Sequence, residues 1–202
     1  MQRIVRSETF GEVLKRNEVT LRYEHFFQSV EPITAPENLK ELLLFAQQHI
    51  PFDSSVEAMR ENMVYPILRE VWKQFIGVYT FWVGVQLSSY VGDEDADYVF
   101  AACSPFGKVV FDTPRVAVVQ VKFAAEPHVW GKCLQNMIEL KEANDQPLPV
   151  FGIVTDGQTW KFGKLENHTL TIHPDLFDRN KLDELFSALT YVLETCKRIY
   201  NL

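Results

Sequence analysis

The feature that most constrains the fold is an amphipathic helix placed between two strand-like segments. Residues 116–123 and 150–155 are short, apolar and rich in β-branched side chains, as strands of a covered sheet are. Between them, residues 128–144 carry apolar side chains at helical spacing. Two strands joined through a helix in this way pair in parallel, with a right-handed connection. The sequence therefore predicts a sheet with a helix against one face.

Segments on both sides of this unit extend the predicted sheet. Strand-like patterns lie at 78–90 and 96–102, and hairpins follow through Asp156-Gly157, a two-residue turn, and Glu166-Asn167-His168. Helices are predicted over 37–49, 55–75 and 180–199, with a short one capped by Ser7-Glu8-Thr9 and running through Leu14. We therefore predict an α/β domain over 51–202, a mixed β-sheet flanked by helices, with 1–50 as an N-terminal helical extension.

Charge and cysteine content limit the partners and the compartment. The 202 residues include 20 Lys and Arg and 27 Asp and Glu, and the net charge of −7 argues against a broad basic surface for nucleic acid. Cys103, Cys133 and Cys196 form no C-x-x-C pair, which favours a reducing cytoplasm over a disulfide framework. No run of about 18 apolar residues is present, so we expect no membrane span.

Polar residues interrupt the apolar strands at one place. Gln120 and Lys122 share a face of the 116–123 strand, because side chains alternate between the two faces. Asp97 lies near the start of the preceding strand. If the two strands are neighbours, an acid, an amide oxygen and an ammonium group converge, as in a metal-dependent phosphodiester hydrolysis site. The alternative is an edge strand that turns Gln120 and Lys122 to solvent.

The long helix over 55–75 offers a further acid. Its apolar stripe consists of Val56, Met59, Met63, Val64, Ile67, Leu68, Val71, Trp72 and Phe75. Glu57 falls inside this stripe and Glu61 at its border. A carboxylate on a core-facing surface needs a partner, either a Lys or Arg side chain or a metal or water at the site. Pro66 predicts a kink in this helix.

In order and spacing, these residues resemble the PD-(D/E)xK nuclease superfamily, which has a restriction-endonuclease-like fold. The resemblance is closer to uncharacterised bacterial proteins, common in cyanobacteria, and to the N-terminal nuclease region of type I restriction subunits. It covers about residues 54–200. The matching phrases are Arg60-Glu61, residues 64–72, Ala96-Asp97-Tyr98, residues 119–122, Trp130, residues 151–157 and residues 160–165.

The resemblance implies a DNA endonuclease that uses magnesium, with manganese as a second candidate, and it admits a homodimer. Asp97 matches the first metal-binding acid, Lys122 the catalytic lysine, and Glu61 or Glu57 the helical acid. Gln120 departs from the usual Glu, so the site would bind metal through a neutral oxygen and more weakly. The closer relatives carry Gln at the position of Lys132, and Gln135 is the candidate substitute for substrate contact.

Two functions therefore stay open. One is a metal-dependent endonuclease with an altered site, in which Asp97, Gln120 and Glu61 hold the metal. The other is a catalytically inactive nuclease-fold protein that binds nucleic acid or a protein partner. The histidines, His25, His49, His128, His168 and His173, are scattered in the sequence. We expect them to be surface or hydrogen-bonded residues rather than ligands.

Overall fold

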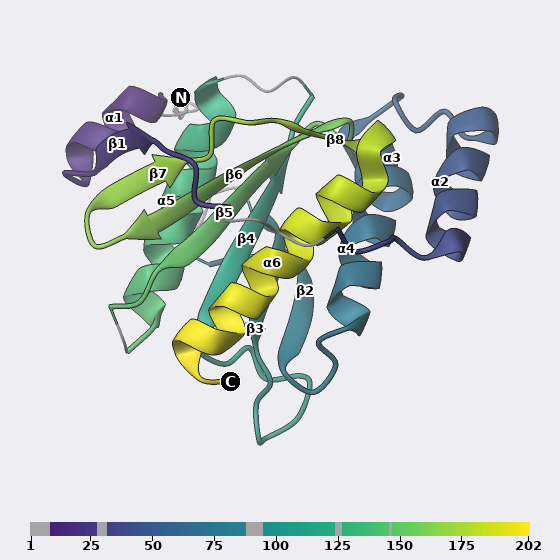
Figure 1. Ribbon diagram of the computed structural model, residues 1–202. Helices are drawn as coiled ribbons and strands as arrows, with labels where there is room; N and C mark the ends of the chain where they lie inside the picture. Colours follow the sequence, from purple (N-terminus) through teal and green to yellow (C-terminus); the bar gives the residue numbers. More distant parts are fainter. Residues whose placement is uncertain (1–8, 28–31, 88–94, 124–126, 146) are drawn as a thin grey trace, which may run out of the picture.

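An eight-stranded mixed sheet forms the centre of the molecule in a computed structural model of the chain (Figure 1). The structure describes residues 9–27, 32–87, 95–123, 127–145 and 147–202. The sheet order is β1-β7-β6-β5-β4-β3-β2, and the short β8 pairs with β6. Helices cover both faces, and Figure 1 shows α6 crossing one face while α5 lies behind the strands. The predicted α/β class with a mixed sheet is confirmed.

The predicted crossover unit is present at the middle of the sheet. Strands β4 (Arg115–Val121) and β5 (Val150–Thr155) pair in parallel, and α5 (Pro127–Ala143) connects them. The meander before this unit consists of β2 (Tyr79–Val85) and β3 (Ala96–Ala102), each antiparallel to the next strand. The last predicted residues of the first strand, 88–90, lie outside the described residues. The order is therefore helix, three antiparallel strands, helix, parallel strand.

Two hairpins complete the sheet after β5. Strand β6 (Thr159–Glu166) pairs back on β5, and β7 (Thr169–Ile172) pairs back on β6. The last β5–β6 pair is Thr155 with Trp160, and the Asp156 N–H donates to the Thr159 carbonyl, so the turn is centred on Gly157-Gln158 and the predicted position at Asp156-Gly157 was wrong. Asp156 Oδ1 accepts hydrogen bonds from the backbone amides of Gln158 and Thr159, which holds Asp156 at the start of the turn. Strand β8 (Phe177–Asp178) and a 3₁₀ turn, η2 (Arg179–Lys181), lead into α6 (Leu182–Tyr200).

The α5 face of the sheet lies close to its helix at two strand residues that lack side chains. Gly152 of β5 and Gly163 of β6 are paired across the strands. A Cβ atom on Gly163 would lie 2.8 Å from Cζ3 of Trp130, and one on Gly152 would lie 2.8 Å from Sγ of Cys133. Trp130, Cys133 and Met137 of α5 are buried in this layer. These glycines let α5 approach the sheet.

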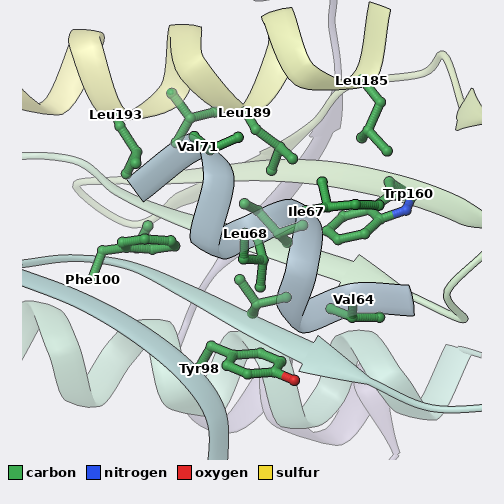
Figure 2. Close-up of a cluster of buried hydrophobic side chains, with 14 of the residues drawn as sticks. Val64, Ile67, Leu68, Val71, Tyr98, Phe100, Trp160, Leu185, Leu189 and Leu193 are labelled. Carbon is green, nitrogen blue, oxygen red and sulfur yellow. The ribbon is translucent and has the colours of Figure 1, made fainter. Parts of the chain in front are cut away.

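The opposite face is covered by α2 (Glu37–His49), by the long helix and by α6. Figure 2 shows Ile67, Leu68 and Val71 of the long helix among side chains of α6 and of the sheet. Leu189, Leu193 and Phe100 belong to the same buried cluster. Strand side chains alternate between the two layers, since Val119 belongs to this cluster and Val118 to the one under α5.

The long helix begins at Val56 and consists of three segments, α3 (Val56–Met59), a π-helical turn η1 (Arg60–Val64) and α4 (Tyr65–Lys73). Pro66 lies in the first turn of α4, where its missing N–H is tolerated. A wider, π-helical turn therefore precedes the proline at which a kink was predicted. A wider turn changes the angle between successive side chains. The apolar stripe, which was drawn at a constant angle per residue, therefore no longer predicts correctly which way side chains before the turn, such as that of residue 57, point. For this reason Glu57, predicted to face the core, is exposed.

The first part of the chain adds a strand that the sequence analysis missed. Helix α1 (Phe10–Arg16) is capped by Thr9, whose side chain forms a capping box with Glu12. Strand β1 (Thr20–Tyr23) then pairs in parallel with β7, so this segment belongs to the main sheet. Helix α2 matches the prediction over 37–49. In the described ranges, no helix has the length and apolar character needed to cross a membrane.

Replacing Gly163 by Ala should lower the free energy of unfolding by about 1–3 kcal/mol, because the added methyl group overpacks the layer against Trp130. Gly11 of α1 is a matched control, since a Cβ there meets nothing within 4 Å. Gly11→Ala should be neutral or stabilise by up to about 1 kcal/mol. Denaturant unfolding measures both changes. Equal destabilisation by the two substitutions would contradict the close approach of α5.

Candidate functional site

The sheet brings Asp97 and Gln120 together, as predicted. Tyr98 of β3 pairs with Val119 of β4 in antiparallel register, which places Asp97 beside Gln120. The Gln120 side-chain amide donates to Asp97 Oδ2 at 2.8 Å, and the backbone N–H of Val121 donates to the same oxygen at 2.6 Å. Asp97 and Gln120 are both buried. The pair therefore lies within the protein, at the start of β3 and the end of β4.

A cation from the long helix completes the partners of the carboxylate. Arg60 Nη1 lies 3.0 Å from Asp97 Oδ1. The Arg60 guanidinium also lies 5.5 Å from the ring centroid of Tyr98, and the Tyr98 hydroxyl donates to the Arg60 carbonyl at 3.1 Å. Burial raises the pKa of Tyr98 to about 12, so this hydroxyl stays protonated and remains a donor. Arg60 is thus held on both sides by residues of β3.

Helix α5 fixes the orientation of the Gln120 amide. Asn136 Nδ2 donates to Gln120 Oε1 at 3.0 Å, and Asn136 is itself fully buried. Since the Gln120 oxygen faces a donor, its NH₂ group faces the Asp97 carboxylate. The opposite orientation would set two oxygens and two NH₂ groups against each other. The half-buried Arg60 and the buried Asp97, Gln120 and Asn136 form one polar network, which we call the Asp97 network.

This network differs from the metal site that the sequence predicts. Asp97 Oδ2 accepts hydrogen bonds from two N–H groups, and Asp97 Oδ1 is paired with the Arg60 guanidinium. The Gln120 oxygen that was predicted to hold a metal faces Asn136 instead. The charge of Asp97 is balanced by Arg60. A magnesium ion at this place would have to displace the guanidinium and rotate the amide.

Lys122 follows the last residue of β4 and is half-buried. Its backbone N–H donates to the Thr155 carbonyl at 3.0 Å, so the parallel pairing with β5 continues one residue beyond the strand. The edge-strand alternative for Gln120 and Lys122 is wrong, because β4 lies between β3 and β5 in the sheet.

The acids predicted on the long helix face solvent. Glu57 and Glu61 are both exposed, so the expectation that one of them lies on the covered side is wrong. The buried carboxylate of this helix is Glu70, whose Oε1 lies 2.7 Å from Lys73 Nζ and 3.5 Å from Arg69 Nη2. The long helix therefore contributes a cation, Arg60, to the surroundings of Asp97 and not an acid.

The predicted substrate contacts on α5 lie away from its inner face. Gln135 accepts a hydrogen bond from Arg16 of α1 and donates to Glu139 at 3.1 Å. Lys132 is half-buried. The residue that the sequence analysis missed is Asn136, although a signal was present. Asn136 falls at helical spacing between Cys133 and Leu140, so it is a polar side chain on the apolar stripe.

A second group of side chains, far from the Asp97 network in sheet order, could hold a metal ion. His25, His173 and Asp175 each offer one ligand atom, and these atoms lie within 4.8 Å of one another. Burial lowers the pKa of the His173 imidazole below its ordinary value, and the neighbouring Asp175 carboxylate offsets only part of this decrease. No pattern in the sequence indicates that His25 and His173 are neighbours.

Comparisons with known proteins do not relate either site to a known family. No protein-family model matches the chain, and no curated protein matches it.

Replacing Asn136 by Ala should lower the free energy of unfolding by about 1–3 kcal/mol, because Gln120 Oε1 is then buried without a donor. Gln135→Ala, one position earlier on the same helix, is the control. It should lower the free energy of unfolding by no more than about 1 kcal/mol, because water can replace its hydrogen bonds to Arg16 and Glu139. Chemical denaturation measures both, and a larger loss for Gln135→Ala would contradict the assignment of Asn136 to the network.

Proposed function

We propose that this chain is a restriction-endonuclease-like protein that binds a macromolecular partner without cleaving DNA. The observation that supports this most directly is the pairing of the Asp97 carboxylate, the expected metal ligand, with Arg60 and Gln120. Magnesium is held in proteins by oxygen ligands, carboxylates above all. Here the same oxygens are occupied by nitrogen donors.

The element order supports the family part of the proposal. The resemblance implies a helix, a strand, a second strand with the acid, a third strand with the lysine motif, a crossover helix and a further strand. The elements α4, β2, β3, β4, α5 and β5 follow this order, with Asp97 on β3 and Gln120 on β4. The order of the elements and the strands that carry Asp97 and Gln120 thus both agree with what the resemblance implies.

Charge supports the non-catalytic part of the proposal. The Asp97–Arg60 pair is neutral, and Glu57 and Glu61 are exposed. Among the described residues, the Asp97 carboxylate is thus paired with a cation and has no second carboxylate from the long helix beside it, whereas a hard dication favours several oxygen ligands. The net charge of −7 favours a protein as the partner over a nucleic acid, because DNA repels an acidic surface.

A second candidate function is the magnesium-dependent endonuclease itself. The neighbouring positions of Asp97 and Gln120 favour it, with Lys122 two residues further along the same chain segment. In this candidate, substrate and metal displace Arg60, and the Gln120 amide turns its oxygen to the ion. Asp97 and Gln120 would hold the metal, which would supply polarisation of the phosphate, while Lys122 would position the attacking water or stabilise the developing charge.

The Gln120→Glu variant separates the two candidates. In the non-cleaving protein, a second carboxylate beside Asp97 removes a donor and adds repulsion, so unfolding free energy in metal-free buffer should fall by about 1–3 kcal/mol. Neither this variant nor the parent should nick plasmid DNA with magnesium or manganese. Gln47→Glu, on the exposed side of α2, adds the same charge elsewhere and should leave stability nearly unchanged.

The endonuclease candidate gives the opposite results. The parent would nick DNA, and Gln120→Glu would gain magnesium affinity and cut at least as well. Lys122→Ala would abolish cutting in both backgrounds. Calorimetric metal titration beside the nicking assay measures these outcomes, and cutting that depends on Lys122 would overturn the non-cleaving proposal.

A further inference from the structure

The parallel pairing of β1 with β7 brings two distant histidines together. Tyr23 of β1 pairs with Ile172 of β7, and both strands end there. His25 follows β1 by two residues, and His173 directly follows β7. Asp175 lies two residues beyond His173. The three side chains therefore meet where the first segment of the chain leaves the sheet.

Their spacing suits a tetrahedral ion. His25 Nδ1 lies 3.3 Å from Asp175 Oδ2, and His173 Nε2 lies 3.5 Å from the same oxygen. Ligand bonds of about 2.0–2.1 Å at tetrahedral angles place neighbouring ligand atoms about 3.3–3.5 Å apart. Two of the three separations already have this value. The three ligand atoms lie within 4.8 Å of one another, so a small movement of the exposed His25 completes the set.

The aromatic surroundings hold one ligand in place before any ion binds. The His173 side chain is 4% exposed, and its ring lies 4.7 Å from that of Phe27 and 5.2 Å from that of Phe26. The side chains of His25 and Asp175 are 64% and 66% exposed. An ion at this place would therefore have one rigid ligand, two adaptable ones and a coordination position open to water.

We propose that His25, His173 and Asp175 form a binding site for a divalent transition metal of the zinc class. Two imidazoles and one carboxylate favour zinc over magnesium, which prefers oxygen ligands. The site is distinct from the Asp97 network, because β7 and β3 are separated by β6, β5 and β4 in the sheet order. By joining His25 to His173 and Asp175, the ion would fasten the segment after β1 to the end of β7.

Metal binding must change one hydrogen bond. The backbone N–H of Phe26 donates to His173 Nδ1 at 3.3 Å, so in the neutral ring the proton is on Nε2, facing Asp175. When Nε2 binds the ion, this proton moves to Nδ1 and the ring stays neutral. Phe26 N–H then loses its acceptor. The amide of Phe26 is therefore a reporter for occupancy of the site.

Calorimetric titration of tag-free protein with zinc chloride tests the proposal. We expect one zinc ion per chain. His25→Ala and Asp175→Asn should each weaken zinc binding by more than about tenfold, because even the loss of a residue that only hydrogen-bonds to a metal ligand can weaken binding by that much. Both side chains are exposed, so these variants should keep the fold. His168→Ala, which removes an exposed histidine elsewhere, should leave the affinity unchanged.

Nuclear magnetic resonance adds a readout that surface adsorption of zinc would not move. Zinc should shift the Phe26 amide signal of the parent, and the shift should disappear in His25→Ala. Magnesium at the same concentration should leave this signal unchanged. The proposal is overturned by no binding below about 1 mM zinc, by equal affinity in the parent and in both ligand variants, or by an equal loss in His168→Ala.

Discussion

The negative charge of a buried carboxylate must be balanced by nearby cations or hydrogen-bond donors. In this protein, the groups that balance one such carboxylate connect the helix layers on both faces of the sheet. Asp97 is balanced by Arg60 from the helix layer on one face and by Gln120, which Asn136 of α5 orients from the other. An unpaired charge in the interior costs several kcal/mol, so the three elements that supply these partners are constrained relative to β3. The network thus specifies how the long helix, the strands and α5 meet at this end of the sheet.

The sequence predicts most of the fold because its signals are local and periodic. The crossover over residues 116–155 and the helices near 37–49 and 182–200 follow from apolar spacing and from Pro and Gly at their ends. Strand β1 was missed because four residues with mainly exposed side chains carry no burial pattern. The turn after β5 was predicted one residue too early, because its position depends on hydrogen bonds to Asp156.

In the candidate site, only the positions of the strand residues could be predicted from the sequence. Alternation along two neighbouring strands places Asp97 beside Gln120 without further information. The helix residues could not be placed, because the π-helical turn over 60–64 shifts the phase of the side chains before it. That shift turns Glu57 outward, while Arg60 reaches Asp97. The closeness of His25 and His173 depends on β1, and therefore no pattern in the sequence indicates it.

Strand β1 also changes what β7 exposes. With β1 in place, β7 has strand neighbours on both sides. Without it, β7 would present a row of free backbone N–H and C=O groups, and its apolar residues Leu170 and Ile172 would lie beside that row. Open edges of this kind pair with other chains and lead to aggregation. Strand β1 therefore covers the edge of β7 with a short strand whose side chains are mainly exposed, and a version of the protein that lacks residues 1–23 would be prone to self-association.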